Sequence, residues 1–329
     1  MNNTSICLYN LIINWNVLIT VLSVISGFFV ATTIYLKNGG RAVIMSLFYT
    51  LSIILSFLLS RLLHYLCHLE QYNNIGEAFT NYNIGSFFMP GIVLAVIILA
   101  AILRAVKLID NLSILLDAMA PSLAFVMSMI RFADRFTGEC QGKYVIPSYL
   151  VSFLILLALF ILLFILGISA LSPAKGDMFR LFLAIYGASE IFIDSTRNDA
   201  SHVFLPGESM IAFNNASGFV ALSQIIGAIL CIYIFIYYIV KIIKVNKMLD
   251  VNEKISKLVL KLVALILYFI AACSFIGLAE YKVQRHSSEF VKYYSIQVTA
   301  IIVMLVTIYL MYRIHKKAVY KSISQRCPS

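Results

Sequence analysis

Long apolar runs separated by short polar segments cover almost the whole chain. A helix needs about 20 apolar residues to cross a bilayer, and each run has roughly that length. The runs are continuous and do not alternate with a period of two, which excludes a transmembrane barrel. The pattern predicts an all-α, polytopic membrane helix bundle with about nine transmembrane spans. They are expected at residues 10–36, 43–67, 84–106, 112–133, 147–171, 178–196, 218–244, 258–280 and 292–314.

Composition favours a membrane protein over a soluble one. The 329 residues would suffice for two soluble domains by length alone. However, 61% of the residues are hydrophobic and only 12% are charged, about half the charged fraction of a typical soluble domain. A net charge of +10 would suggest nucleic-acid binding in a soluble protein, but in a membrane protein Lys and Arg mark the cytoplasmic loops. No nucleic-acid partner is therefore expected.

The distribution of basic residues predicts the orientation of the spans. If the N-terminus lies outside, most of the 25 Lys and Arg residues fall in inner loops or in the C-terminal tail. The richest inner segments are residues 241–261 and 313–326. The first residues lack the basic start of a cleavable signal, so the first run is expected to be a true span. We therefore predict an N-out, C-in protein with a long interfacial inner loop at about residues 245–257.

The segment IRFADRFTGECQGK, residues 130–143, is unusually polar for its place between two apolar runs. It carries two arginines, an aspartate, a glutamate and a lysine, and the predicted orientation puts it at the outer face. Arg131 and Arg135 are four residues apart and would share a helix face. Two such guanidinium groups are suited to bind a phosphate. The plainer interpretation is that each arginine extends from a helix end to the membrane interface.

Two more polar groups are expected in the outer half of the membrane. One helical face carries side chains spaced by four, four and three residues, namely Tyr186, Glu190, Asp194 and Arg197. The end of the second run carries Arg61, His64 and His68. Ionisable side chains in a span must face protein or water, so the three groups together predict a polar cavity open to the outside. An acidic stripe that only stabilises helix packing is the alternative, and neither a metal nor an organic cofactor is expected.

These residues stand in segments that resemble a known family, the prolipoprotein diacylglyceryl transferases. The stretch DAMAPSLAFVMSMIRFADRFTGECQG is similar to the family signature, in which Asp and Ala-Pro precede an arginine-containing core at a fixed spacing. Its matching positions are Asp117, Pro121, Arg131, Gly138, Glu139 and Gly142. LFLAIYGASEIFIDSTR resembles the segment that leads to a second essential arginine, and ALSQIIGAIL resembles the start of the last family helix. The matching positions there are Tyr186, Gly187, Ala188, Arg197 and Gln224.

The resemblance covers roughly residues 10–244 and implies a seven-helix core of the family type. The last two runs, from about residue 258, have no counterpart in that core. We therefore expect two parts in the chain. Residues 1–245 would form a diacylglyceryl-transferase-like transmembrane core, and residues 246–329 a C-terminal two-helix extension with a basic cytoplasmic tail.

The resemblance also implies a reaction. The family transfers the diacylglyceryl group of phosphatidylglycerol to the lipobox cysteine of a lipoprotein signal peptide, at the outer face of the bacterial cytoplasmic membrane. Glycerol phosphate leaves and a thioether forms, so the expected partners are phosphatidylglycerol, the signal peptide and membrane lipid. Catalytic roles are expected for Arg131, Glu139, Arg197 and Tyr186. Substrate-binding roles are expected for Arg61, His64, Asp134, Gly138, Gly142, Glu190, Asp194 and Gln224.

The chain departs from the family pattern at several positions. Asp134 stands where the family core has Asn, and Glu190 stands where a basic residue is usual. Met89 occupies the place of a His or Tyr, the usual candidate for the general base. The base is therefore left open between Glu139, His64 and a positive potential that favours the thiolate. The alternative function is a lipid-binding or transport protein whose catalysis is altered or lost.

Overall fold

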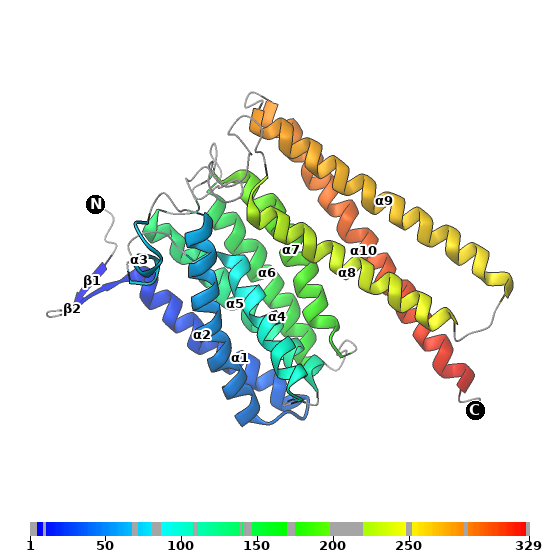
Figure 1. Ribbon diagram of the computed structural model, residues 1–329, viewed down its shortest axis with the longest axis horizontal. Coiled ribbons are helices and arrows are strands. Elements are labelled where there is room, and N and C mark those ends of the chain that lie inside the picture. Colours follow the sequence, from blue (N-terminus) through cyan, green and yellow to red (C-terminus); the bar gives the residue numbers. More distant parts are fainter. Residues whose placement is uncertain are drawn as a thin grey trace. The chain divides into compact units, whose positions relative to one another are not determined.

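Helices make up nearly all of the computed structural model (Figure 1). It describes residues 5–8, 11–67, 72–80, 87–107, 109, 111–138, 140, 142, 147–169, 175–197, 220–247, 252–285 and 289–326. The predicted helical class is confirmed. The described helices are α1 (Trp15–Lys37), α2 (Ala42–Cys67), α3 (Ile75–Thr80), α4 (Met89–Ala105), α5 (Leu112–Thr137), α6 (Ser148–Ile168), α7 (Asp177–Thr196), α8 (Leu222–Lys247), α9 (Asn252–Arg285) and α10 (Phe290–Arg326).

A short antiparallel hairpin precedes α1. Strands β1 (Ser5–Leu8) and β2 (Leu11–Asn14) pair with Ser5 opposite Asn14. The predicted start of the first span at residue 10 was wrong, because α1 begins only at Trp15. The two isoleucines of β2 favour an extended backbone, and β1 supplies the partner strand that this backbone needs.

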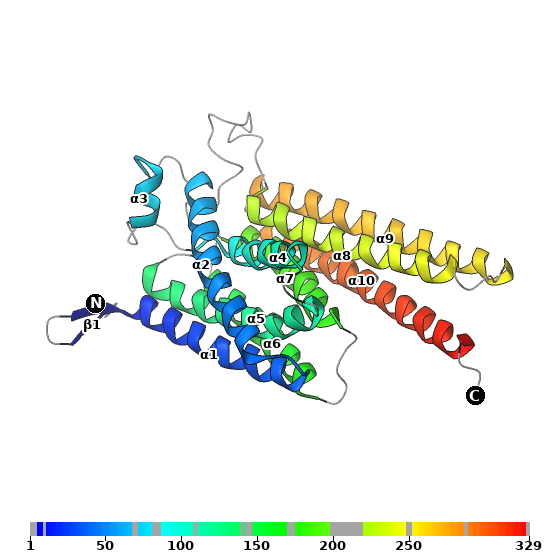
Figure 2. The same ribbon diagram turned by 60° about the horizontal axis from the view of Figure 1, so that its bottom comes forward.

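The first compact unit comprises Met1–Phe182 and Thr196–Gln224. Within it α5 packs against both α1 and α6, while α2 packs against α1 and α4 (Figures 1 and 2). Helix α1 approaches its neighbours closely at Gly27, where an added Cβ would lie 2.6 Å from both Tyr49 Oη and Val126 Cγ2. Small residues of this kind let membrane helices pack tightly in the absence of a hydrophobic driving force.

The second compact unit comprises Leu183–Ser195 and Ile225–Ser329. In it α9 packs against α10, and the ring of Phe235 on α8 stacks on Phe269 of α9 with centroids 4.0 Å apart. Helices α7 and α8 meet backbone to backbone at two glycines. A Cβ added to Gly187 would lie 2.6 Å from the carbonyl oxygen of Gly227. The two C-terminal helices therefore share a unit with most of α7 and α8.

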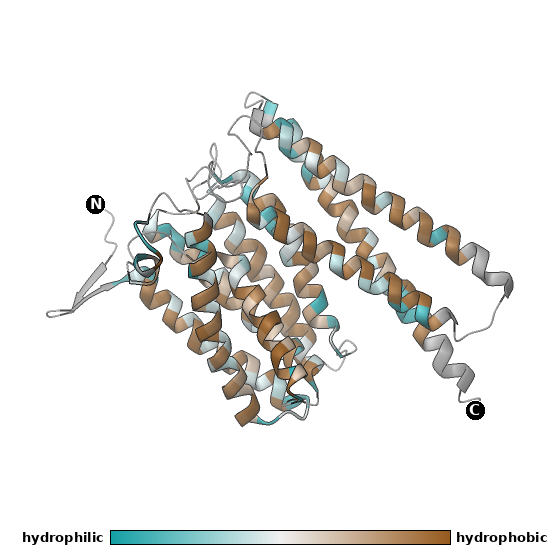
Figure 3. Cartoon of the chain, in the orientation of Figure 1, coloured by the Kyte–Doolittle hydropathy of each residue, from teal (hydrophilic) through white to brown (hydrophobic). Residues whose placement is uncertain are grey.

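Seven of the described helices are long and apolar enough to cross a membrane: α1, α2, α5, α6, α8, α9 and α10. Figure 3 shows hydrophobic residues along the lengths of these helices, and many of their apolar side chains are exposed. The chain is therefore an integral membrane protein. Helices α4 and α7 form where two further spans were predicted, but α4 has only 17 residues and α7 carries buried acidic groups. The number of nine spans stays a prediction.

The segment between α8 and α9 is shorter than the inner loop that was predicted there. Helix α8 continues to Lys247 and α9 begins at Asn252, so most of the loop predicted over residues 245–257 is helical. The first ten residues of α9 include three Lys, two Leu and one Glu, which are good helix formers. That preference outweighs the polarity that had suggested a loop.

Candidate functional site

The C-terminal end of α5 carries two of the predicted charged residues. Nη1 of Arg131 lies 3.3 Å from Oδ2 of Asp134, and both side chains are buried. Gly138 follows with a φ of 76°, and its N–H donates to the Asp134 carbonyl at 3.1 Å. This left-handed cap favours a residue without a Cβ and ends the helix sharply. The chain then passes through buried Cys140, whose carbonyl accepts from the N–H of Tyr149 at 3.0 Å.

The two arginines predicted to bind a phosphate together differ in exposure. Arg135 lies in the last turn of α5 and is exposed, whereas Arg131 is buried and forms an ion pair with Asp134. Equal helical spacing thus does not give the two side chains the same environment. Their joint binding of a phosphate stays a prediction.

The first unit brings the segment after α5 next to the second predicted arginine. Gly142 pairs with Arg197 in an isolated antiparallel bridge. The Ser148 hydroxyl at the start of α6 lies 3.0 Å from the carbonyl and 2.8 Å from the hydroxyl of Thr196, the residue before Arg197. Arg197 is 8% exposed. The backbone around Arg197 is therefore held by Gly142 and by Ser148.

Arg61 and His64, near the end of α2, already have structural contacts. Nε of Arg61 donates to the carbonyl of Ala78 on α3 at 2.8 Å. Nδ1 of His64 lies 3.0 Å from Oη of Tyr72. Both side chains are buried. These contacts tie α3 and the residues before it to α2, in addition to any role in binding substrate.

Tyr186, Glu190 and Asp194 lie on α7 within the second unit. Their spacing of four residues puts them on one helical face, and their exposed fractions are 0%, 1% and 3%. Such burial keeps the carboxyl groups away from lipid, where an ionisable group would be costly. The structure therefore supports a protein-facing position for this polar stripe.

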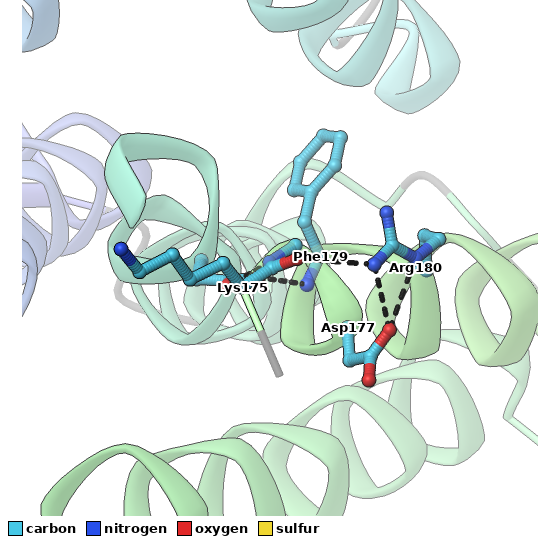
Figure 4. A network of polar contacts seen from close by, with 6 residues as sticks. Lys175, Asp177, Phe179 and Arg180 are labelled. Atoms are coloured by element: carbon cyan, nitrogen blue, oxygen red, sulfur yellow. Dashed lines mark hydrogen bonds and ion pairs between the residues drawn. The ribbon is translucent and has the colours of Figure 1, made fainter. Parts of the chain in front are cut away.

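Helix α7 is anchored at its N-terminus by Asp117 of α5. The Asp117 carboxylate accepts from the N–H of Phe179 at 2.9 Å and from the N–H of Gly176. The first N–H groups of a helix have no partner within the helix, and the helix dipole favours a negative charge there. Next to this contact, Nη2 of Arg180 lies 2.6 Å from Oδ1 of Asp177 (Figure 4). The signature aspartate thus acts as a cap supplied from another helix.

Gln224 caps the helix on which it lies. Its Oε1 accepts from the N–H of Ala221 at 2.9 Å, and the side chain is 4% exposed. Ala221 directly precedes α8, so the contact is the backward half of a capping box. This contact gives Gln224 a structural role as a helix cap. Its predicted role in substrate binding stays a prediction.

An apolar cavity of about 320 Å³ lies among α1, α2, α4 and α5. On α5 its lining runs from Met119 to Ile130, which is about 16 Å at the helical rise of 1.5 Å per residue. Ile130 directly precedes Arg131. The few polar groups of the lining include the hydroxyls of Tyr49 and Ser122, which lie 3.3 Å apart. The cavity can hold an apolar chain, and its last lining residue on α5 is followed in the sequence by buried Arg131.

A buried polar network that the sequence analysis missed links α7, α9 and α10. Nε2 of Gln297 donates to Oε2 of Glu280 at 2.8 Å, and the Ser195 hydroxyl donates to Oε1 of Gln297 at 3.0 Å. All three side chains are at most 3% exposed. A signal existed in the sequence, because an ionisable or amide side chain within an apolar run requires a polar partner.

Two predicted residues, Glu139 and His68, fall outside the described residues. Their predicted roles therefore stay predictions. Across the described part of the chain, no group of three or more His, Cys, Asp or Glu side chains is placed to hold a metal ion. The described residues instead provide buried arginines, an apolar cavity and carboxylates that hold helices in place.

Comparison with known proteins provides independent information on the family. A family model described as prolipoprotein diacylglyceryl transferase matches residues 4–243. A search of curated proteins finds no match. The family match covers well over half of the chain and contains every predicted site residue from Arg61 to Gln224. The chain therefore belongs to the prolipoprotein diacylglyceryl transferase family.

Proposed function

We propose that the protein transfers a diacylglyceryl group from phosphatidylglycerol to the thiol of a lipobox cysteine in a lipoprotein signal peptide. Family membership supports the reaction class, because this is a family of transferases that act on prolipoproteins. The observation that carries the proposal is the apolar cavity whose lining on α5 ends at Ile130, the residue before buried Arg131 in the sequence. A phospholipid matches such a site, because it joins an apolar chain to an anionic group.

The cavity provides room for part of an acyl chain. An engineered cavity of about 150 Å³ binds benzene, so a space of about twice that volume can hold several methylene groups. Its length along α5, from Met119 to Ile130, suits an extended chain rather than a compact ligand. An acyl chain in this position would put the glycerol and the phosphate near Arg131.

The arginines would bind the phosphate and stabilise its leaving form. Guanidinium groups match phosphate oxygens in geometry and charge, and Arg131 and Arg197 are the buried arginines nearest to the signature segments. Asp134 would hold Arg131 in place before lipid arrives and would compete with the phosphate for it. The balance between these two partners sets the affinity for lipid.

The transfer step follows from this arrangement. The thiolate sulfur attacks the carbon of the diacylglyceryl group that is bonded to the phosphate oxygen. An S–C bond forms and this C–O bond breaks. The electron pair leaves on the oxygen of glycerol phosphate, whose charge the arginines stabilise. The thiol proton passes to a base, for which Glu139 and His64 are the candidates.

We further propose that the chain crosses the bacterial cytoplasmic membrane nine times, with its N-terminus outside. The basic segments 241–261 and 313–326 then lie inside, as expected for cytoplasmic loops. In this orientation the cavity and Arg131 lie in the outer half of the bilayer, where phosphatidylglycerol can meet an exported signal peptide. Residues 1–245 would form the catalytic core and residues 246–329 an extension to it.

The test uses radiolabelled phosphatidylglycerol, a lipobox cysteine peptide and the purified full-length chain in detergent. Arg131→Ala is compared with Arg135→Ala, an exposed arginine on the same helix. The wild-type chain should label the peptide, Arg131→Ala should label it about a hundredfold more slowly, and Arg135→Ala should resemble the wild type. Bound lipid without any labelled peptide would point to the lipid-binding or transport alternative. Equal rates in both variants would remove Arg131 from the site.

A further inference from the structure

The last turn of α7 is in contact with α10, which lies outside the family match. Oη of Tyr294 donates to the carbonyl of Ser195 at 2.8 Å. Because α7 ends at Thr196, this carbonyl belongs to the last turn, where carbonyl oxygens have no N–H partner within the helix. The Tyr294 ring also meets Phe192 edge to face, with centroids 6.2 Å apart. Helix α10 therefore supplies a cap for the C-terminus of α7.

A second contact holds the same turn through its side chain. The Ser195 hydroxyl donates to Oε1 of Gln297 at 3.0 Å and lies 2.8 Å from the Phe192 carbonyl. Gln297 can present Oε1 to Ser195 because its Nε2 donates to the Glu280 carboxylate at 2.8 Å. A carboxylate only accepts hydrogen bonds, so Glu280 fixes which way the amide points. The direction of the whole chain of bonds is thus set from α9.

The composition of this network is more than ordinary helix packing needs. A glutamate in an apolar span is costly, and apolar side chains or glycines are sufficient to pack membrane helices. Glu280 is nevertheless 3% exposed and Gln297 is fully buried. Their placement gives one turn of α7 a defined position, which packing of similar apolar surfaces would leave adjustable.

The turn that is held carries a residue of the predicted site. Asp194, which is expected to bind substrate, directly precedes Ser195. A rotation or fraying of this turn would therefore move the Asp194 side chain. Reaction rates are sensitive to such movement, because a displacement of about 1 Å can cost about a hundredfold.

We infer that the C-terminal extension supplies positioning residues for the transfer reaction. Tyr294 and Gln297, the latter oriented by Glu280, hold the last turn of α7 at Ser195 and thereby hold Asp194. This role belongs to helices beyond residue 243, where the family match ends. It rests on the proposed function, because positioning for transfer presupposes that the chain transfers.

The first experiment needs no catalytic activity. Hydrogen exchange is followed by mass spectrometry in peptides that cover residues 190–197 of the full-length chain, for the wild type, Tyr294→Phe and Tyr309→Phe. Tyr309 is also on α10 but is 54% exposed, so its variant removes a hydroxyl that does not reach α7. Exchange should rise about fivefold in Tyr294→Phe, the effect of losing one hydrogen bond, and should not change in Tyr309→Phe.

The second experiment measures transfer by the same variants together with Glu280→Leu and Glu280→Gln. Tyr294→Phe and Glu280→Leu should lower kcat about tenfold with little change in the KM for phosphatidylglycerol, because the lipid still enters the same cavity. Glu280→Gln keeps an oxygen that accepts from Gln297 and should restore most of the rate. Rates are compared at equal amounts of monodisperse protein, so that a loss of folded protein does not count as a loss of kcat.

The outcomes separate this inference from the proposed function. Unchanged exchange at residues 190–197 in Tyr294→Phe would overturn the inference whatever the activity. Raised exchange with an unchanged kcat would also overturn it, because the extension would then only stabilise the fold. A wild-type chain that transfers nothing would overturn the proposed function, and the exchange data would still decide whether α10 holds α7.

Discussion

The two ends of α7 are held in different ways. At its N-terminus, the carboxylate of Asp117 accepts from two backbone N–H groups. At its C-terminus, the phenol of Tyr294 donates to one backbone carbonyl. Asp117 lies within the region that matches the family, whereas Tyr294 lies in the extension beyond it. The same helix thus has a charged cap from the family core at one end and a neutral cap from the extension at the other.

The difference indicates which end is the fixed one. Hydrogen bonds to a charged group contribute about 1.5–3 kcal/mol, and neutral ones about 0.5–1.5 kcal/mol. The dipole of α7 adds to the attraction at its N-terminus. We therefore expect the Asp117 contact to anchor the helix and the Tyr294 contact to set the finer position of the residues next to Arg197. Stability should depend mainly on the first contact, and rate mainly on the second.

Replacing the charged cap should have the largest effect on stability. Asp117→Ala leaves two buried N–H groups without their acceptor, so the free energy of unfolding should fall by about 3 kcal/mol. The measurement is unfolding in mixed micelles of increasing denaturing detergent. Asp117→Asn keeps one acceptor oxygen and should lose about half as much. A loss under 0.5 kcal/mol in the Ala variant would show that the charged cap is not the anchor.

The second-largest effect on stability is expected at the close contact of α7 with α8. In Gly187→Ala the new Cβ would lie 2.6 Å from the Gly227 carbonyl oxygen, and backbone cannot move aside as a side chain can. Overpacking of this kind costs about 1–3 kcal/mol. Gly277→Ala on α9 is the matched control, because no atom lies within 4 Å of its added Cβ. Equal stability of the two variants would mean that the caps alone determine where α7 lies.

The helices could be predicted from the sequence because a helix satisfies its backbone hydrogen bonds within its own segment. In a membrane this requirement makes every apolar run of sufficient length a helix, whatever its neighbours. The hairpin before α1 was missed, because β2 depends on a second strand that hydropathy does not reveal. Likewise, Gly187 was recognised only as part of a motif. The reason why a glycine is needed there is the close backbone of Gly227, which the sequence does not show.

The candidate site was predictable only in part, and the missing part is tertiary. Spacing along one helix placed Tyr186, Glu190 and Asp194 together on a buried face of α7, but the fourth predicted member, Arg197, lies beyond the end of that helix. The pairing of Ser195 with Gln297 joins residues 102 positions apart, which no local pattern specifies. The volume of the apolar cavity depends on how four helices pack, and no pattern along one helix specifies that packing. Residue types were thus predictable, but their partners were not.

The buried carboxylate of Asp134 is expected to affect lipid binding, whereas that of Asp117 is expected to affect stability. Asp134→Asn removes the negative charge beside Arg131, so the affinity for phosphatidylglycerol should rise about tenfold, the lower end of the effect of one charged hydrogen bond. Binding is measured by fluorescence titration with lipid micelles. Asp177→Asn is the control, because Asp177 forms an ion pair of the same spacing with Arg180. A similar rise in both variants would attribute the effect to net charge alone.

The smallest effect is expected at the start of α8, where the cap is local. Gln224→Ala loses one hydrogen bond to the Ala221 N–H, and a helix cap contributes about 1 kcal/mol, so the unfolding free energy should fall by that amount. Gln224→Glu should keep the stability, because glutamate makes the same contact in a capping box. Neither variant should change the rate of transfer at equal amounts of folded protein. If Gln224→Ala instead slows transfer more than tenfold, the side chain contacts substrate, and the predicted binding role would hold in addition to the cap. The unaffected rate expected here is what distinguishes a cap that only builds the core from the Tyr294 cap, which holds the turn before Arg197.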